Sequence, residues 1–398
     1  MRIALTGATG LLGRNLLFEF IKRHRDRLDS LEVIALGRGA GDLSFRQRLV
    51  EIFQDDAAWY VCGKPTLDRD IADFLRDRVS TLDFDLSSGV LDPAAHEILR
   101  REPIDYFFHV AAMLDFRDSP AVARAHERAN VEGTEILLSL VSTLSIREFV
   151  YVGSAYECGI VPKGTESIAA GDLDVTRSFR NPYELGKARA ELLVRDFERT
   201  HKVRCRYFRP STLCGRLIEP PLGRLPKFDV FYAFGAFLLR YKLKFIDSFE
   251  ERYTTPVELD LRIRYRTDTG LNIVPADYAA KAMYLICTSG TPGSHFHLAN
   301  AAETPNALVV ALTCATLNIT GHRQCDDLPI DQNPHESVYY RTVGKIYTPY
   351  VIGEPMLFDV SNVESVLRDA QLTCPPVDAA NFATLMDYAK ERDFGISA

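Results

Sequence analysis

The 398-residue chain has no Cys-x-x-Cys pair, no block of like charges and no uninterrupted apolar run long enough to span a bilayer. Its eight cysteines are scattered, which argues against a zinc site, and we expect no metal; the cysteines leave disulfide pairing open. The net charge of -7 argues against nucleic acid as a partner. A short apolar run near the N-terminus is broken by Gly7 and does not have the form of a signal peptide.

The composition is that of a globular protein, with 46% hydrophobic and 25% charged residues. The length is sufficient for one large core and a second lobe. The sequence contains neither an internal repeat nor a low-complexity tract. We therefore expect an ordinary folded protein whose function depends on local motifs.

A glycine-rich turn at residues 6–13 lies between an apolar strand and an apolar helix, the context that a dinucleotide-binding motif requires. Gly7 allows the tight turn, Gly10 lets a pyrophosphate approach the backbone, and Gly13 lets the helix pack closely on the strand. The N-terminus of that helix faces the negative charge. The residues expected to bind a dinucleotide here are Thr6, Gly7, Thr9, Gly10, Leu11, Leu12 and Gly13.

A tyrosine and a lysine lie four residues apart in the helix predicted over residues 183–199. This spacing puts Tyr183 and Lys187 on the same helix face. A nearby cation favours the phenolate, so we expect Lys187 to lower the pKa of Tyr183 and to allow proton exchange near neutral pH.

The two motifs, in this order, resemble the extended branch of the short-chain dehydrogenase/reductase superfamily, whose glycines are spaced Gly-x-x-Gly-x-x-Gly. The resemblance covers about residues 1–300. It implies a Rossmann-type α/β fold with a doubly wound parallel sheet, a nicotinamide cofactor, and a catalytic set of Ser154, Tyr183 and Lys187. In this set the Ser154 hydroxyl would polarise a substrate carbonyl. A nucleotide enzyme of this kind is most simply a reduced cytoplasmic protein.

Strands and helices alternate through the first half of the chain, which also predicts a parallel sheet. A proline-rich stretch at residues 220–226 marks a lobe boundary, and residues 272–281 resemble the family's return to the nucleotide domain. The strict alternation over residues 257–266 predicts a strand with one wet face. We expect a Rossmann domain at 1–212 and 271–300 and a smaller, discontinuous substrate lobe at 213–270 and 301–398.

The residue after the second predicted strand, Arg38, lies where the adenosine ribose is expected. An acidic residue there would bind the 2′-hydroxyl of NAD, whereas arginine suits a 2′-phosphate. Arg48 is the expected second partner, and Arg46 belongs equally well to a solvated helix face. We therefore expect NADPH in preference to NADH.

The superfamily resemblance implies further cofactor-binding residues. They would lie beside the adenine or the nicotinamide, or where the backbone runs close to the cofactor. Among these, Asn130 would either brace the site or relay protons. His109 is more typical of a buried core residue than of a catalyst. The additional expected positions are Asp85, Leu86, Ala111, Ala112, Asn130, Pro210 and Ser211.

Within the superfamily, four stretches resemble the fatty acyl-CoA reductase and thioester reductase branch. They are residues 36–38 with 46–49, 109–112 with 115–116, 153–156 and 272–281. The chain departs from this branch at Gly153-Ser154, where Ser-Thr is usual, and in its short C-terminal region. The resemblance implies NADPH-dependent reduction of an acyl thioester, on coenzyme A or an acyl carrier protein, to an aldehyde or further to an alcohol.

Other functions stay open. An epimerase or dehydratase acting on a nucleotide sugar would keep NAD tightly bound, and a hydroxysteroid-type dehydrogenase is a third candidate. A redox-sensing regulator would not need an intact Ser, Tyr and Lys set. The aromatic run at residues 228–239 is compatible with a lobe core, with an acyl-chain wall or lid, or with peripheral contact to a membrane. Monomer and homodimer are both compatible with the sequence.

Overall fold

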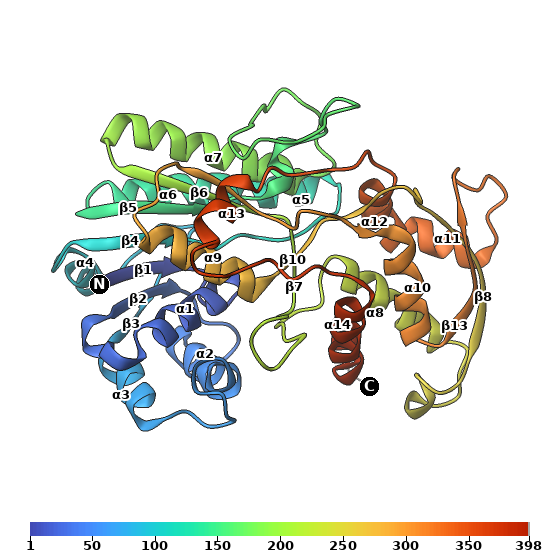
Figure 1. Ribbon diagram of the computed structural model, residues 1–398, viewed down its shortest axis with the longest axis horizontal. Coiled ribbons are helices and arrows are strands. Elements are labelled where there is room, and N and C mark those ends of the chain that lie inside the picture. Colours follow the sequence, from blue (N-terminus) through green and yellow to red (C-terminus); the bar gives the residue numbers. More distant parts are fainter. Residues whose placement is uncertain (397–398) are drawn as a thin grey trace.

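The computed structural model describes residues 1–396. Within them, a seven-stranded parallel sheet has the order β11-β6-β5-β4-β1-β2-β3 (Figure 1). The strand order reverses between β1 and β4, which places a crevice at their carboxyl ends. The Rossmann-type doubly wound fold expected from the sequence is confirmed. The strands are β1 (Arg2–Thr6), β2 (Glu32–Gly37), β3 (Val79–Asp83), β4 (Ile104–His109), β5 (Ile146–Val152), β6 (Arg204–Pro210) and β11 (His295–Leu298).

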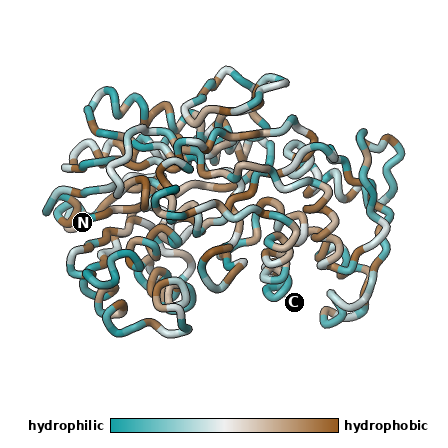
Figure 2. Tube along the Cα trace, in the orientation of Figure 1, coloured by the Kyte–Doolittle hydropathy of each residue, from teal (hydrophilic) through white to brown (hydrophobic). Residues whose placement is uncertain are grey.

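Helices cover both faces of this sheet, so its strands are buried on both sides. Successive side chains of a strand point to opposite faces. In β4, Phe107 accordingly packs in one core and Phe108 in the other. Figure 2 shows the resulting apolar strands inside more polar helices. The helices around the sheet are α1 (Leu11–Arg23), α2 (Phe45–Ile52), α3 (Arg69–Asp77), α4 (Pro93–Arg100), α5 (Pro120–His126), α6 (Gly133–Val141), α7 (Pro182–His201), α9 (Ala276–Thr288) and α13 (Ser361–Leu367).

Irregular helical turns join several of these elements. Two of them are π-helical, η2 and η3, and η2 extends α2 directly. The turns are η1 (Arg25–Ser30), η2 (Phe53–Cys62), η3 (Glu127–Glu132), η4 (Ala155–Cys158), η5 (Phe249–Glu251) and η6 (Asp393–Gly395).

A second hydrophobic cluster lies beside the large sheet, on the right in Figure 1. Its strand β8 alternates between buried residues, such as Leu259 and Leu261, and exposed ones, such as Glu258 and Asp260. The predicted strand with one wet face is thus confirmed, and β8 pairs with β13 in parallel. The elements are β8 (Val257–Arg264), β13 (Ile319–Cys325), α8 (Phe231–Lys242), α10 (Asn306–Thr316), α11 (Pro334–Arg341), α12 (Val343–Val351) and α14 (Ala379–Glu391).

The aromatic run at residues 228–239 forms most of α8 and lies in this second cluster. Phe231 and Phe234 are fully buried. The Phe231 ring packs on Phe382, and the Phe234 ring stacks on Tyr347 at a centroid distance of 5.1 Å. Of the three hypotheses for this run, the lobe core is therefore the one the structure supports. These rings pack against C-terminal residues and cannot wall a substrate cleft.

Short strand pairs connect the two clusters, and the C-terminal segment crosses back between them. Val363 and Leu367 of α13 belong to the core around the large sheet, where α13 packs on α9 and β11. Part of the segment assigned to the substrate lobe at 301–398 thus lies with the nucleotide-binding part. The connecting pairs are β7 (Thr212–Cys214) with β10 (Ile273–Pro275), and β9 (Gly270–Leu271) with β12 (Thr304–Pro305).

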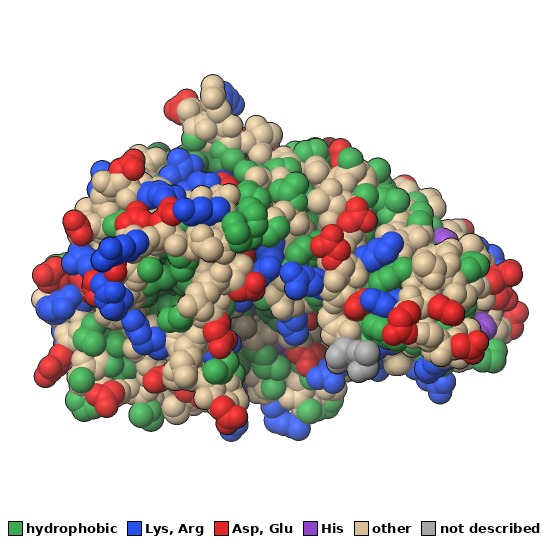
Figure 3. Space-filling view, turned by 90° about the horizontal axis from the view of Figure 1, so that it is seen from below, with side chains coloured by type: hydrophobic (Ala, Val, Ile, Leu, Met, Phe, Trp, Pro, Cys, Tyr) green, Lys and Arg blue, Asp and Glu red, His purple; other side chains and the backbone are tan. Residues whose placement is uncertain are grey.

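Across residues 1–396, no helix combines the length and apolar character needed to cross a membrane. The same residues contain no group of three or more His, Cys, Asp or Glu side chains arranged to hold a metal ion. Acidic and basic side chains are interspersed on the face shown in Figure 3.

Candidate active site

The glycine turn between β1 and α1 forms the floor of a cleft at the carboxyl ends of the central strands. Gly7 has a φ of +77°, and a Cβ there would lie 2.6 Å from the backbone nitrogen of Ala111. A Cβ on Gly13 would lie 2.1 Å from the carbonyl oxygen of Gly7. Gly10 is exposed at the surface of the turn. Both tight contacts require glycine, and the turn presents bare backbone to the cleft, which suits a pyrophosphate.

The cleft collects most of the residues expected at the site. Asn130, Ser211 and Ser154 are the expected residues that do not line it. Those that do are Thr6, Gly7, Thr9, Gly10, Leu11, Leu12, Gly13, Arg38, Arg48, Asp85, Leu86, Ala111, Ala112, Tyr183, Lys187 and Pro210.

Several further lining residues were not identified from the sequence. Most of them end or follow the central strands, and the rule that ligands bind at the carboxyl ends of parallel strands could have found those; Phe45, Ala129 and Leu213 come from α2, η3 and β7. They include Leu36, Gly37, Phe45, Phe84, Ser87, Val110, Met113, Leu114, Ala129, Val152, Gly153 and Leu213.

Two arginines lie side by side at the end of the cleft where the adenosine was expected from the sequence. Arg48 of α2 donates to the carbonyl oxygen of Arg38 at 2.7 Å, and its other terminal nitrogen lies 3.5 Å from Thr9 Oγ1. The Arg38 guanidinium lies 3.5 Å from Asp85 Oδ2. Arg46, two residues before Arg48, instead donates to backbone carbonyls outside the cleft, including that of Val79 at 3.1 Å. Arg48 and Arg46 therefore face different surroundings although they share a helix.

At the other end of the cleft, Tyr183 lies in the first turn of α7. The Asn181 side chain caps this helix by accepting from the backbone of Glu184 at 3.1 Å, and Pro182 follows at the first helical position. Lys187, one turn later, donates to the carbonyl oxygen of Val152 at 2.6 Å. The cap and the helix spacing thus place the two side chains near the carboxyl end of β5.

The electrostatics of this pair differ from the expectation. Burial and the Glu157 carboxyl raise the pKa of Tyr183, and a hydrogen bond with the Ser154 hydroxyl opposes this. Burial also lowers the pKa of Lys187 to about 8, although the nearby carboxyls of Glu157 and Glu191 act to raise it. The expected lowering of the pKa of Tyr183 by Lys187 is not seen, because burial disfavours the phenolate. Tyr183 accordingly holds its proton at neutral pH.

Ser154 is buried at the end of β5, directly behind the cleft. Its hydroxyl accepts from the backbone nitrogen of Tyr156 at 3.2 Å and lies near the Tyr183 hydroxyl, whose pKa it helps to lower. Ser154 and Tyr183 are thus brought together from segments 29 positions apart, as counted along the chain.

The remaining expected residues support the site from outside the cleft. The Asn130 side chain accepts from the backbone nitrogen of Met113 at 2.8 Å and donates to its carbonyl at 3.1 Å, which favours bracing of the cleft wall. Ser211 is buried next to Pro210, and its hydroxyl has no hydrogen-bond partner among the described residues. His109 lies between two threonine hydroxyls, and burial lowers its pKa to about 3. His109 is thus a neutral core residue.

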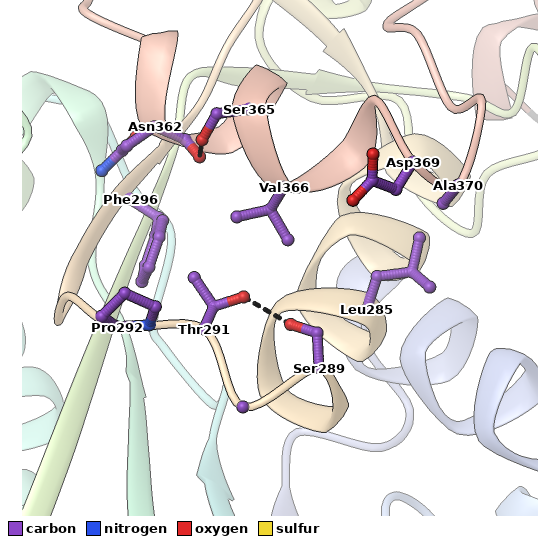
Figure 4. A pocket seen from close by; sticks show the side chains of 11 residues that line it. Leu285, Ser289, Thr291, Pro292, Phe296, Asn362, Ser365, Val366, Asp369 and Ala370 are labelled. Carbon is purple, nitrogen blue, oxygen red and sulfur yellow. Dashed lines mark hydrogen bonds between the residues drawn. The ribbon is translucent and has the colours of Figure 1, made fainter.

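A second hollow lies between α9 and α13, away from the glycine turn (Figure 4). Its side chains are mostly small or apolar, with Ser289 and Thr291 bonded to each other and Asp369 at one end. It contains none of the residues expected to act in catalysis.

Comparison with known proteins places this chain in a family of NAD-binding proteins, in agreement with the glycine turn in the cleft. The model of the male sterility protein family, an NAD-binding family, matches residues 5–283. A linear gramicidin synthase polypeptide of Brevibacillus parabrevis is 23% identical over 405 residues, which cover 96% of this chain and 7% of that protein. Isonitrile lipopeptide synthase of Mycobacterium tuberculosis is 31% identical over 159 residues, which cover 38% of this chain and 6% of that protein. The chain therefore spans a small part of either relative.

Solved structures share the fold over nearly the whole chain. The terminal R domain from the myxalamid PKS-NRPS biosynthetic pathway has a TM-score of 0.69 and 21% identity, covering 99% of this chain and 91% of that one. A thiolation-reductase di-domain from an archaeal non-ribosomal peptide synthetase has a TM-score of 0.67 and 18% identity, with coverages of 99% and 76%. The dTDP-glucose 4,6-dehydratase DesIV of Streptomyces venezuelae, solved with NAD, has a TM-score of 0.64 and 18% identity, with coverages of 98% and 97%.

The family match covers more than half of the chain, and the cleft contains the glycine turn, Tyr183 and Lys187, with Ser154 buried directly behind it. The chain belongs to the male sterility protein family, within the extended short-chain dehydrogenase/reductases, a superfamily of NAD(P)-dependent oxidoreductases.

Proposed function

We propose that this protein is an NADPH-dependent reductase of an acyl thioester, releasing an aldehyde and a thiol. One observation carries the proposal: a single cleft joins two arginines at its adenosine end to Tyr183 and Lys187 at its other end. Arg38 and Arg48 offer the guanidinium groups that a 2′-phosphate would engage. The glycine turn offers the backbone surface that a pyrophosphate needs.

The chain's own residues would act on the carbonyl oxygen of the thioester. The bound nicotinamide supplies a hydride for the carbonyl carbon. Ser154 and Tyr183 donate hydrogen bonds to the oxygen as negative charge develops there, and Tyr183 transfers its proton to it. Breaking the carbon–sulfur bond of the resulting hemithioacetal releases aldehyde and thiol, and the hydroxyl proton leaves with the sulfur. One thioester, one hydride and one proton thus give one aldehyde and one thiol.

A carrier-bound thioester is favoured over acyl-CoA by the kinds of protein that this chain resembles. The relatives include a gramicidin synthase and a lipopeptide synthase, and one similar structure is a thiolation-reductase di-domain. We therefore infer that the acyl group arrives on the pantetheine arm of a carrier protein. The product would be an aldehyde, with further reduction to an alcohol as a second step at the same residues.

The nucleotide-sugar dehydratase is the second candidate, because DesIV shares the fold. Elimination of water from a sugar needs an acid and a base in addition to the hydride-transfer residues. Within residues 1–396, Asp85 is the only carboxylate that lines the cleft, and it lies at the adenosine end. This arrangement favours carbonyl reduction.

The test is incubation of the purified protein with NADPH and a panel of acyl carrier protein thioesters, acyl-CoAs, free aldehydes and nucleotide sugars. We expect loss of nicotinamide absorbance with a thioester, and one equivalent of free thiol per aldehyde formed. Two equivalents of NADPH per thiol would indicate an alcohol product. Turnover of a nucleotide sugar with tightly held NAD, and no thiol release from any thioester, would refute the proposal.

A further inference from the structure

A cluster of buried charged side chains lies behind the proposed catalytic residues, on the side away from the cleft. Glu157, Glu191 and Arg209 each have 0% exposed side-chain surface. They come from η4, α7 and β6, three elements that meet beneath the end of β5. Burying charges is costly unless they are paired and hydrogen-bonded, and these residues are not needed to line the cleft. Their arrangement therefore calls for a function other than cofactor contact.

Glu157 holds the backbone of Ser154 from behind. Its Oε2 accepts from the Ser154 backbone nitrogen at 3.2 Å, while the Ser154 hydroxyl accepts from the backbone of Tyr156 at 3.2 Å. Together these bonds form a capping box that starts η4. The position of the Ser154 hydroxyl thus depends on the Glu157 carboxyl.

The Glu157 carboxyl also explains Gly153, at which this chain departs from the branch it resembles. A Cβ at position 153 would lie 2.6 and 2.7 Å from the two carboxyl oxygens of Glu157. The φ of Gly153 is not in the left-handed region, so the need for glycine comes from the neighbouring carboxyl. The two positions are therefore linked: the carboxyl fits because residue 153 has no side chain.

The other end of the cluster is attached to the helix that carries Tyr183 and Lys187. Glu191 follows Lys187 by four residues, so the three side chains share one face of α7. Glu191 accepts from Arg209 at 2.6 and 2.9 Å, and Arg209 also contacts Glu157. A continuous set of contacts therefore joins the Ser154 backbone to the Tyr183 face of α7.

The pKa values of the two carboxyls in this cluster shift in opposite directions. Burial and the charge of Glu191 raise the pKa of Glu157, whereas Arg209 helps to lower the pKa of Glu191 to about 2. The Glu157 carboxyl, which accepts from Ser154, therefore lies between the Glu191 carboxyl, which raises its pKa, and the Arg209 guanidinium, which opposes this. The other groups that face these carboxyls are Lys187, Arg195 and His295, with Tyr183 and Tyr151 beside Lys187.

We propose that Glu157 is a positioning residue, which fixes the Ser154 hydroxyl relative to Tyr183 through the Glu191–Arg209 pair and requires glycine at position 153. The inference rests on the proposed roles of Ser154 and Tyr183. Glu157 does not contact the substrate, so its effect would reach the reaction only through the placement of Ser154.

The first test compares Glu157→Gln with Glu157→Ala. The side-chain oxygen of glutamine can accept from the Ser154 backbone as the carboxyl does, so we expect its kcat within about threefold of the unchanged protein. Alanine removes this acceptor, and its kcat should fall about tenfold or more, up to the roughly 10²–10³ contributed by an oxyanion donor. NADPH affinity should stay within about twofold in both variants, because Glu157 does not line the cleft.

The second test uses Gly153→Ala alone and together with Glu157→Ala. The added methyl should reduce kcat when Glu157 is present and should cost nothing further once the carboxyl is gone, so the two effects are not additive. Glu198→Ala is the matched control. Glu198 also lies on α7 and accepts a backbone hydrogen bond, from Cys205 at 3.0 Å, but it does not contact Ser154. Its removal should leave kcat unchanged.

A readout independent of turnover is hydrogen exchange at the Ser154 amide, measured by NMR on the folded variants. The amide should exchange faster in Glu157→Ala than in the unchanged protein and in Glu157→Gln. If the protein reduces free aldehydes but no thioester, the thioester proposal is refuted. The same variants are then compared on the aldehyde, which still tests the positioning role of Glu157. Unchanged amide exchange and a kcat within twofold in Glu157→Ala, or additive effects of the double variant, would overturn the inference.

Discussion

The two arginines at the adenosine end predict a measurable preference for NADPH. Arg48 is held by its bond to the Arg38 carbonyl at 2.7 Å and reaches the glycine turn at Thr9. Arg38 is held by fewer contacts, since 74% of its side chain is exposed and its guanidinium lies 3.5 Å from Asp85 Oδ2. Both guanidinium groups would donate hydrogen bonds to a 2′-phosphate, which NADPH carries and NADH does not.

A hydrogen bond to a charged group contributes about 1.5–3 kcal/mol, and about 1.4 kcal/mol corresponds to a tenfold change in affinity. Solvent screens Arg38, so we place its contribution at or below the lower limit, about tenfold. Arg48 is partly buried and anchored, and Arg48→Ala should weaken NADPH binding by about 10–100-fold. Because Arg48 also holds the Arg38 backbone, the double variant should lose less than the product of the two single effects.

The assay is titration with NADPH and with NADH, followed by nicotinamide fluorescence. The unchanged protein should bind NADPH at least tenfold tighter, and Arg38→Asp should narrow or invert this ratio. Arg46→Ala is the matched control: it removes the same charge from the same helix, but Arg46 is bonded to Val79 outside the cleft. Equal affinities for the two cofactors, or a ratio narrowed as much by Arg46→Ala as by Arg48→Ala, would refute the reasoning.

Further predictions concern the reaction and the stability of the fold. Tyr183→Phe should lower kcat by about 10²–10⁴ and Ser154→Ala by about 10²–10³, with NADPH affinity unchanged by fluorescence titration; near-normal turnover in Tyr183→Phe would contradict its role as proton donor. Burial lowers the pKa of Lys187 to about 8, so its charge is present below that pH, and kcat should fall as the pH rises through this value; a flat profile would be contrary to a charged Lys187. The hydrogen bonds from Arg262 lower the pKa of Glu336 to about 2, so this pair stabilises the fold above the ordinary value of 4.5 and loses its contribution as the pH falls toward 2. Glu336→Gln should therefore destabilise the protein by about 1–3 kcal/mol at neutral pH in denaturant titrations, and the difference from the unchanged protein should shrink in acid.

The sequence by itself determined the nucleotide-binding turn and the pairing of Tyr183 with Lys187. Both depend on a few neighbouring residues: Gly7 is required by its own backbone angle, and a spacing of four residues on a helix sets one face. The doubly wound sheet followed in the same way from the alternation of buried strands with helices. The difference between Arg46 and Arg48 depends on the tertiary structure, because both lie on α2 and only their distant partners distinguish them.

The tertiary structure alone decided the surroundings of these motifs. The aromatic run of α8 became a core because Phe382 and Tyr347, which lie more than a hundred positions later, cover Phe231 and Phe234. The raised pKa of Tyr183 follows from its burial and from Glu157. Local backbone geometry is set by adjacent residues, whereas burial, and the electrostatics that depend on it, are set by segments that meet only after the chain has folded.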